Sequence, residues 1–207
     1  MIRSIDPLQS HRAQSWKLYH QAPMPMVTIF KTLDITSLMK WKEQGFRLNM
    51  LLCYCILQAA SKIKEFYYLP SKDTMLVYEQ LGINVILKNK EGKLSTCDLA
   101  YTSDVNAFSK DYQMNTRQVM ETCKDRELKD CMIIGTSSLV QYDIDGVVNM
   151  YSGIYNNPFL IWGQAHKERE RTRLKVSFQF HHVQMGGLEA CAFLEELQKQ
   201  IDLMSMR

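Results

Sequence analysis

The stretch LKVSFQFHH at residues 174–182, followed by VQMGG at residues 183–187, decides the expected fold. A β-strand turns successive side chains to opposite faces. This alternation predicts that His182 continues one apolar face, while His181 lies on the other face. A desolvated imidazole at the end of such a strand can act as a general base near neutral pH. The residues that share the apolar face with His182 are Leu174, Val176, Phe178 and Phe180.

The length and charge of the chain limit its class. With 207 residues, we expect one domain over residues 1–207, large enough for a substantial core. The formal net charge is +3, and basic residues alternate with acidic ones. This charge is too small to indicate nucleic-acid binding by itself.

The cysteines and the apolar segments indicate a cytoplasmic protein. The six cysteines contain no CxxC pair, so we expect a reduced, buried set and neither disulfides nor a zinc site. The N-terminus lacks the apolar core of a signal peptide. The longest apolar stretch, Leu48 to Ala60, is too short to span a bilayer, and no membrane partner is expected. The cysteines are Cys53, Cys55, Cys97, Cys123, Cys131 and Cys191.

Hydrophobic periodicity and turn residues predict alternating helices and strands. Residues 89–92 (NKEG) predict a hairpin turn, and residues 166–171 predict another turn. Mixed helices and strands indicate an α/β two-layer sandwich with a mixed sheet flanked by helices. The expected helices are 10–20, 37–43, 47–64, 103–129 and 188–204, and the expected strands are 26–32, 75–78, 84–88, 93–98, 131–142, 158–163 and 174–180. The buried side of the last helix is expected to comprise Leu188, Cys191, Ala192, Leu194 and Leu197.

The pair His181-His182, three residues before Gly186-Gly187, resembles the HHxxxDG signature of the chloramphenicol acetyltransferase family. The resemblance covers nearly the whole chain. The catalytic domain of dihydrolipoyl acyltransferases shares that family's fold, but the chain length and the lack of a lipoyl domain favour the acetyltransferase branch. The dihydrolipoyl alternative predicts a larger cubic or icosahedral assembly. Further matching segments are Arg12-xxx-Trp16-xx-Tyr19, Leu33-Asp34-Ile35-Thr36 and Lys64-Glu65-Phe66.

The resemblance implies a metal-free, acetyl-CoA-dependent O-acetyltransferase of the antibiotic-resistance type, with chloramphenicol as the default acceptor. His182 would be the general base, and a serine hydroxyl would stabilise the oxyanion. Alignment on Ser137-Ser138-Leu139 selects Ser137. An ungapped alignment selects Gly135, which has no hydroxyl, and Thr136 has the opposite strand parity. The family is trimeric, with its sites between subunits.

Other family positions match less completely. Tyr19 and Ile161 would line the acceptor pocket, and Lys167 and Arg169 would lie near the CoA phosphates. The lysines and the adenine-stacking aromatic residue that contact CoA in the family have no clear counterparts, since Gln164 and Ala165 occupy part of that region.

The main departure is Gly186, where the family has an aspartate that pairs with the arginine matching Arg12. The resemblance implies that Arg12 supports the histidine loop, and Asp143, Asp145 or Glu189 are candidates to supply the missing carboxylate. This departure supports an alternative function, a trimer of reduced or no activity that binds a ligand or partner.

Overall fold

The computed structural model describes the backbone of residues 2–206 and the side chains of residues 2–205. Its main sheet has seven strands, and parallel pairings join β5 to β7 and β7 to β8, whereas the other neighbours are antiparallel. The predicted mixed sheet is therefore confirmed. The strand order is β2 (Met26–Asp34), β10 (Arg171–His181), β8 (Phe159–Trp162), β7 (Met132–Ser138), β5 (Leu81–Lys88) and β6 (Leu94–Ala100), and β9 (His166–Glu168) pairs with β10.

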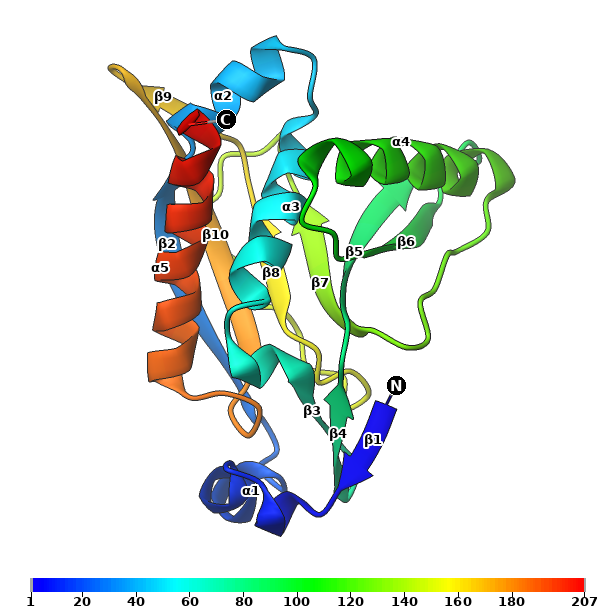
Figure 1. Cartoon of the computed structure of the whole chain (residues 1–207), viewed down its shortest axis with the longest axis vertical. Coiled ribbons are helices and arrows are strands. Elements are labelled where there is room, and N and C mark those ends of the chain that lie inside the picture. The colour runs from blue at the N-terminus through cyan, green and yellow to red at the C-terminus, as the bar shows by residue number, and fades with distance from the viewer. Residues whose placement is uncertain (1, 207) are drawn as a thin grey trace.

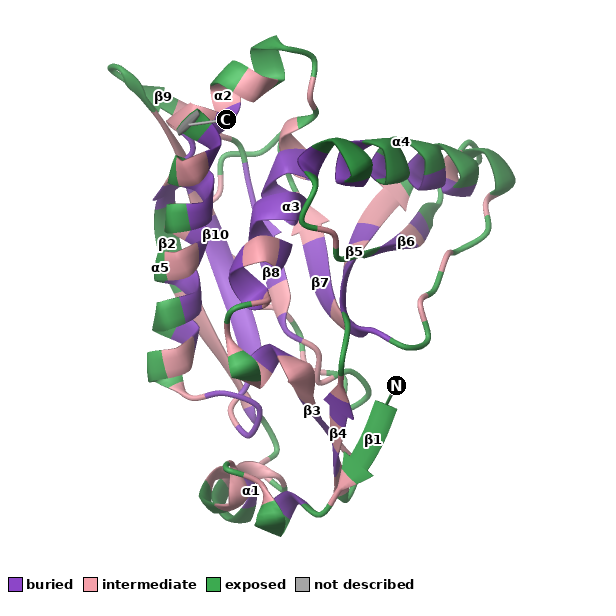
Figure 2. Ribbon diagram, in the orientation of Figure 1, coloured by how far each residue is buried: buried purple, intermediate pink, exposed green. Residues whose placement is uncertain are grey.

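Three helices pack on one face of this sheet, which gives the expected two layers (Figure 1). They are α3 (Leu48–Ala60), α4 (Val105–Thr122) and α5 (Gly187–Leu203). Helix α3 is apolar on nearly all sides and lies buried between its neighbours (Figure 2), as expected for a helix without a polar stripe. The rings of Phe66, Phe178 and Phe193 pack against one another and link the sheet to α5.

A second sheet and the first helix lie at the end of the molecule where β10 finishes (Figure 1). The small sheet has the order β1 (Ile2–Ile5), β4 (Thr74–Tyr78) and β3 (Tyr68–Ser71). Trp16 of α1 (Ala13–Tyr19), Met75 of β4 and Val183 form a small separate core. This core attaches the turn after β10 to both elements. The remaining elements are α2 (Thr36–Glu43) and the short 3-10 helices Pro7–Gln9, Lys64–Tyr67 and Met204–Met206.

Several boundaries differ from the sequence-based expectations. Helix α4 ends at Thr122 because Cys123 takes a left-handed conformation with φ of 57°. Residues 166–171, expected as a plain turn, form a hairpin in which 166–168 are β9, 169–170 are the turn and Arg171 begins β10. On α5, Leu188 is 86% exposed, and Cys191 and Ala192 are also exposed. Leu194 and Leu197 are buried as expected, and the rest of the buried side of α5 consists of Ala190, Phe193, Gln200 and Ile201.

The face of the sheet opposite the helices is crossed by the connection between β7 and β8, residues 139–158, here called the outer loop. The backbone N–H of Val147 donates to the Ser177 hydroxyl at 2.8 Å, and the Gln179 amide donates to the Asn149 carbonyl at 2.9 Å. These bonds satisfy Ser177 and Gln179, two of the buried polar side chains on the outer side of β10. Within residues 2–206, no helix has the length and apolarity needed to cross a membrane.

Candidate active site

His182 lies directly after β10, at the start of a tight turn and thus at the end of the strand, as the sequence predicted. Strand pairing with β2 ends at His181, and the His182 N–H turns to the carbonyl of Pro25, at 2.8 Å. This bond continues the register of β10 and β2 by one residue, since the preceding pairs are Phe180–Val27 and His181–Met26. The side chain is positioned by other contacts, which come from α1 and from the turn itself.

The imidazole of His182 is held on one face and at one nitrogen. Its ring stacks on Tyr19 of α1, with centroids 4.5 Å apart and an interplanar angle of 13°. Such a ring pair contributes about 0.5–1.5 kcal/mol beyond its buried area. Nδ1 lies 3.3 Å from the Met185 carbonyl oxygen. A carbonyl only accepts, so this contact favours a proton on Nδ1 and leaves the lone pair on Nε2. No residue within 2–205 hydrogen-bonds Nε2.

His181 is placed for a structural role, as the sequence predicted. It is 2% exposed, and its Nδ1 accepts the backbone N–H of Val183 at 3.1 Å. Burial, with a smaller contribution from neighbouring His182, lowers the pKa of His181 to about 4. The ring is therefore neutral at neutral pH and is used as a hydrogen-bond acceptor within the turn.

Arg12 binds the same turn through two carbonyl groups. Its Nε donates to Val183 O at 3.0 Å, and its Nη2 donates to His182 O at 2.9 Å. Hydrogen bonds to a charged group contribute about 1.5–3 kcal/mol each. Because Arg12 begins the helix that carries Tyr19, one segment holds both the backbone and the ring of His182.

Of the three candidate carboxylates, only Glu189 lies in this region. Asp143 contacts His166 at 2.9 Å, and Asp145 contacts Lys175. A Cβ built on Gly186 would lie 2.8 Å from Glu189 Oε2 and 3.8 Å from both terminal nitrogens of Arg12. The carboxylate of Glu189 thus fills space that a side chain at position 186 would need.

Ser137 lies on the outer face of the sheet. The flanking hydroxyls point to the helix side, where Thr136 donates to Asn84 O at 2.7 Å and Ser138 accepts from Asn49 at 3.0 Å. Gly135 packs so closely on Phe159 that a Cβ there would lie 2.2 Å from its ring. Among these four residues, Ser137 alone presents a hydroxyl on the outer face, and no described side chain binds it.

Ile161 lies beside Ser137 but far from His182. It pairs with Ser137 across β7 and β8, and with Ser177 across β8 and β10. Strand geometry puts His182 about 16 Å further along β10 and two strand spacings, about 10 Å, across the sheet from Ser137. The predicted site residues therefore form two groups in one chain: Arg12, Tyr19 and His182 at one end, and Ser137 with Ile161 on the outer face.

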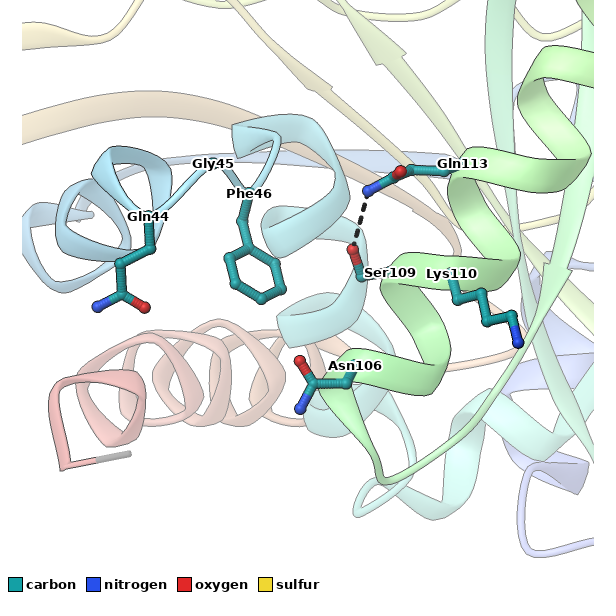
Figure 3. A pocket seen from close by; sticks show the side chains of 7 residues that line it. All are labelled: Gln44, Gly45, Phe46, Asn106, Ser109, Lys110 and Gln113. Carbon is teal, nitrogen blue, oxygen red and sulfur yellow. Dashed lines mark hydrogen bonds between the residues drawn. The ribbon is translucent and has the colours of Figure 1, made fainter.

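Lys167 and Arg169 belong to neither group. Both are exposed on the β9–β10 hairpin, where Arg169 takes a positive φ of 56°. The hairpin extends from the end of the sheet opposite α1 (Figure 1). An open, mostly polar cavity of about 360 Å³ lies elsewhere, and none of the predicted site residues lines it. Figure 3 shows the side chains around it. Its lining comprises Gln44, Gly45, Phe46, Asn106, Ser109, Lys110 and Gln113.

Sequence reasoning missed how the turn is closed. The Pro25 and Met185 carbonyls orient His182, but backbone acceptors leave no residue-type signal. The position of Glu189, three residues after the helix cap Gly186, is a recognisable capping-box spacing and did carry a signal. Asn49 is the other missed residue, and it links Ser138 to the Trp162 indole.

Known proteins share this sequence pattern and fold. The chloramphenicol acetyltransferase family model matches residues 2–198. The chloramphenicol acetyltransferase of Clostridium perfringens is 26% identical, over 98% of this chain and 99% of its own. Chloramphenicol acetyltransferase 2 of Escherichia coli is also 26% identical, over 96% of each chain.

Solved structures support the same assignment of the fold. A chloramphenicol acetyltransferase superposes with a TM-score of 0.82 at 17% identity, covering 97% of this chain and 100% of its own. A probable dihydrolipoamide acetyltransferase from Listeria monocytogenes reaches 0.71 at 12% identity, covering 95% and 93%. With a family match over nearly its whole length, this chain belongs to the chloramphenicol acetyltransferase family.

Proposed function

We propose that this protein is an acetyl-CoA-dependent O-acetyltransferase acting on a small hydroxyl-bearing acceptor, with chloramphenicol as the first acceptor to test. Membership of an acetyltransferase family supports the reaction class. The observation that carries the proposal is the His182 imidazole, which is stacked on Tyr19 and bonded at Nδ1, with Nε2 left available.

His182 would act as the general base. Its Nε2 takes the proton from the acceptor hydroxyl while that oxygen attacks the thioester carbonyl carbon of acetyl-CoA. The resulting tetrahedral oxyanion accepts a hydrogen bond from a serine hydroxyl, for which Ser137 is our candidate. When the intermediate collapses, the carbon–sulfur bond breaks and the CoA sulfur receives the proton from His182. No acyl-enzyme and no metal ion take part.

His182 and Ser137 would act on one substrate only if two copies of the chain contribute to each site. The strand geometry separates them by far more than hydrogen-bond reach in one chain. Large exposed apolar side chains also cluster in the outer loop and on β2, and such patches mark protein interfaces. They include Phe30, Val148, Met150, Ile154 and Tyr155. We therefore infer a homotrimer with sites between subunits.

The remaining substrate contacts follow from the same assembly. Tyr19 would form one wall of the acceptor pocket next to His182, and Ile161 of the neighbour would contribute an apolar surface. Lys167 and Arg169 stay candidates for CoA phosphate binding, because their exposed cationic groups suit phosphate oxygens.

Thiol release from acetyl-CoA, measured with chloramphenicol and a panel of small alcohols, tests the reaction. We expect CoA release that depends on an acceptor and that is lost in His182→Ala. Unchanged turnover in that variant would exclude the mechanism. Native mass spectrometry should give three 24.2-kDa chains per particle, whereas a much larger particle would indicate a dihydrolipoyl-type core.

A trimer that binds a ligand or partner with little or no turnover is the second candidate. The glycine at position 186 favours it, because Arg12 there has no ion pair within 4 Å to any carboxylate of residues 2–205. Absence of CoA release with every acceptor, together with measurable acetyl-CoA binding, would support this candidate over the enzyme.

A further inference from the structure

One peptide group connects His182 to a carboxylate. The carbonyl oxygen of Met185 lies 3.3 Å from His182 Nδ1. The N–H of the same peptide, carried by Gly186, donates to Glu189 Oε2 at 2.8 Å. The carbonyl and N–H of a peptide unit are rigidly coplanar, so a bond that fixes one of them also fixes the other. Hydrogen bonds in series also polarise one another, which strengthens each.

The space around Gly186 keeps the Glu189 carboxylate at this peptide. A Cβ at position 186 would lie 2.8 Å from Glu189 Oε2, so only glycine leaves that position free. The terminal nitrogens of the Arg12 guanidinium lie 3.8 Å from the same point, which favours an anion nearby. Arg12 itself binds the carbonyls of His182 and Val183. The turn is thus bound by the Arg12 cation at two of its carbonyls and by the Glu189 carboxylate at the Gly186 N–H.

We propose that Glu189 is a positioning residue for His182, acting through the Met185–Gly186 peptide, which it holds so that the Met185 carbonyl fixes the Nδ1 proton of the imidazole. The proposal rests on the proposed role of His182 as the base. Glu189 touches neither substrate in this arrangement. Its contribution is to keep Nε2 aimed and unprotonated for the acceptor hydroxyl, by fixing the tautomer and the ring orientation together.

A purely structural role for Glu189 has a different signature. At the third residue of α5 it caps the helix N-terminus and interacts favourably with the helix dipole. Loss of such a cap would lower the melting temperature by about 2–4 °C in a chain of this size. It would not change kcat in the folded enzyme.

Glu189→Gln and Glu189→Ala separate the two roles, with Glu195→Gln on the same helix as the matched control. Glu195 is exposed and lies about two helical turns further on. We expect Glu189→Ala to lower kcat by about 10- to 100-fold with KM for acetyl-CoA within about twofold, since small misplacements of a reacting group are costly. Glu189→Gln, which has the same shape, should lower kcat by a smaller factor of about 3- to 10-fold. Glu195→Gln should leave kcat unchanged.

The ring tautomer gives a readout that does not need turnover. In the intact protein labelled with ¹⁵N-histidine, we expect His182 signals of an Nδ1–H ring, identified by their loss in His182→Ala. These signals should shift or broaden in Glu189→Gln and stay the same in Glu195→Gln. If both Glu189 variants keep wild-type kcat and unchanged His182 signals, Glu189 is a helix cap only and the proposal is wrong. If the wild type transfers acetyl groups to no acceptor, the proposed function fails, and the NMR comparison still decides the role of Glu189.

Discussion

The turn that carries His182 and the strand end that carries Ser137 are held in different ways. The turn is bound on every side within its own chain, by Arg12, Tyr19, Pro25 and the Met185 carbonyl. The Ser137 hydroxyl lies on an outer sheet face, and no described side chain hydrogen-bonds it. A general base needs a fixed tautomer and direction before substrate arrives, and one chain provides both here. An oxyanion donor needs only the right position relative to the reacting carbon, which a neighbouring subunit can provide.

Removing the imidazole of His182 tests the turn, the more firmly held of the two regions, and should have the largest effect on turnover. His182→Ala should lower kcat/KM by about 10²- to 10⁴-fold, the usual contribution of a general base. The thiol-release assay measures it. His166→Ala is the control, because the side chain of that half-buried histidine bonds Asp143 and no other side chain among residues 2–205. Equal losses in the two variants would mean that the effect on His182 is not specific.

Removing the Ser137 hydroxyl tests the strand end on the outer face of the sheet. Ser137→Ala should lower kcat by about 10²-fold or more, because one oxyanion donor is lost. Ser138→Ala removes the same group from the helix side of the strand, where it bonds Asn49, and should change kcat little. A larger loss in Ser138→Ala than in Ser137→Ala would move the donor to Ser138 and reverse our alignment.

Mixing the His182→Ala and Ser137→Ala variants tests whether His182 of one subunit and Ser137 of another form one site. Co-expressed His182→Ala and Ser137→Ala chains should form mixed trimers in which some sites combine an intact histidine with an intact serine. Random assembly around a three-fold axis gives one intact site in about four. Activity should therefore recover to about a quarter of wild type, although each variant alone is nearly inactive. Sites built within one chain would give no recovery.

The sheet was predictable from sequence because its signals are local. Alternation marked β10, and the turn at residues 89–92 correctly joined β5 to β6. The small sheet of β1, β3 and β4 was not recognised as a unit, because β1 and β4 are paired across about 70 residues of sequence. The sequence predicts a helix over 103–129, whereas α4 ends at Thr122. The left-handed conformation of Cys123 that ends it is not indicated by the residue type.

The candidate site was only partly predictable for a related reason. Arg12, Tyr19 and His182 were expected together and lie together. The face of His182 stays a prediction, and the bond from the His182 N–H to the Pro25 carbonyl keeps the β10–β2 register at that residue. The separation of Ser137 from His182 depends on strand order, which a linear sequence does not specify. The roles of Ser137, Ile161, Lys167 and Arg169 stay predictions.

The smallest expected effect concerns the space that residue 186 and Glu189 share beside the His182 turn. The melting temperature measures it. Gly186→Asp should lower the melting temperature, because its Cβ would lie 2.8 Å from Glu189 Oε2 and would add a second carboxylate there. The contacting oxygen is the end of a flexible side chain, so Glu189 can move aside and lose its capping bond to the Gly186 N–H, at a cost of about 0.5–2 kcal/mol. In a Glu189→Ala background the space is free and the Arg12 guanidinium lies 3.8 Å from the added Cβ, so the same change should cost less. Two substitutions that share one space couple in this way, whereas independent ones add. Additive shifts in the four melting temperatures would show that residue 186 and Glu189 do not compete, and that the turn is closed chiefly by Arg12 and the backbone.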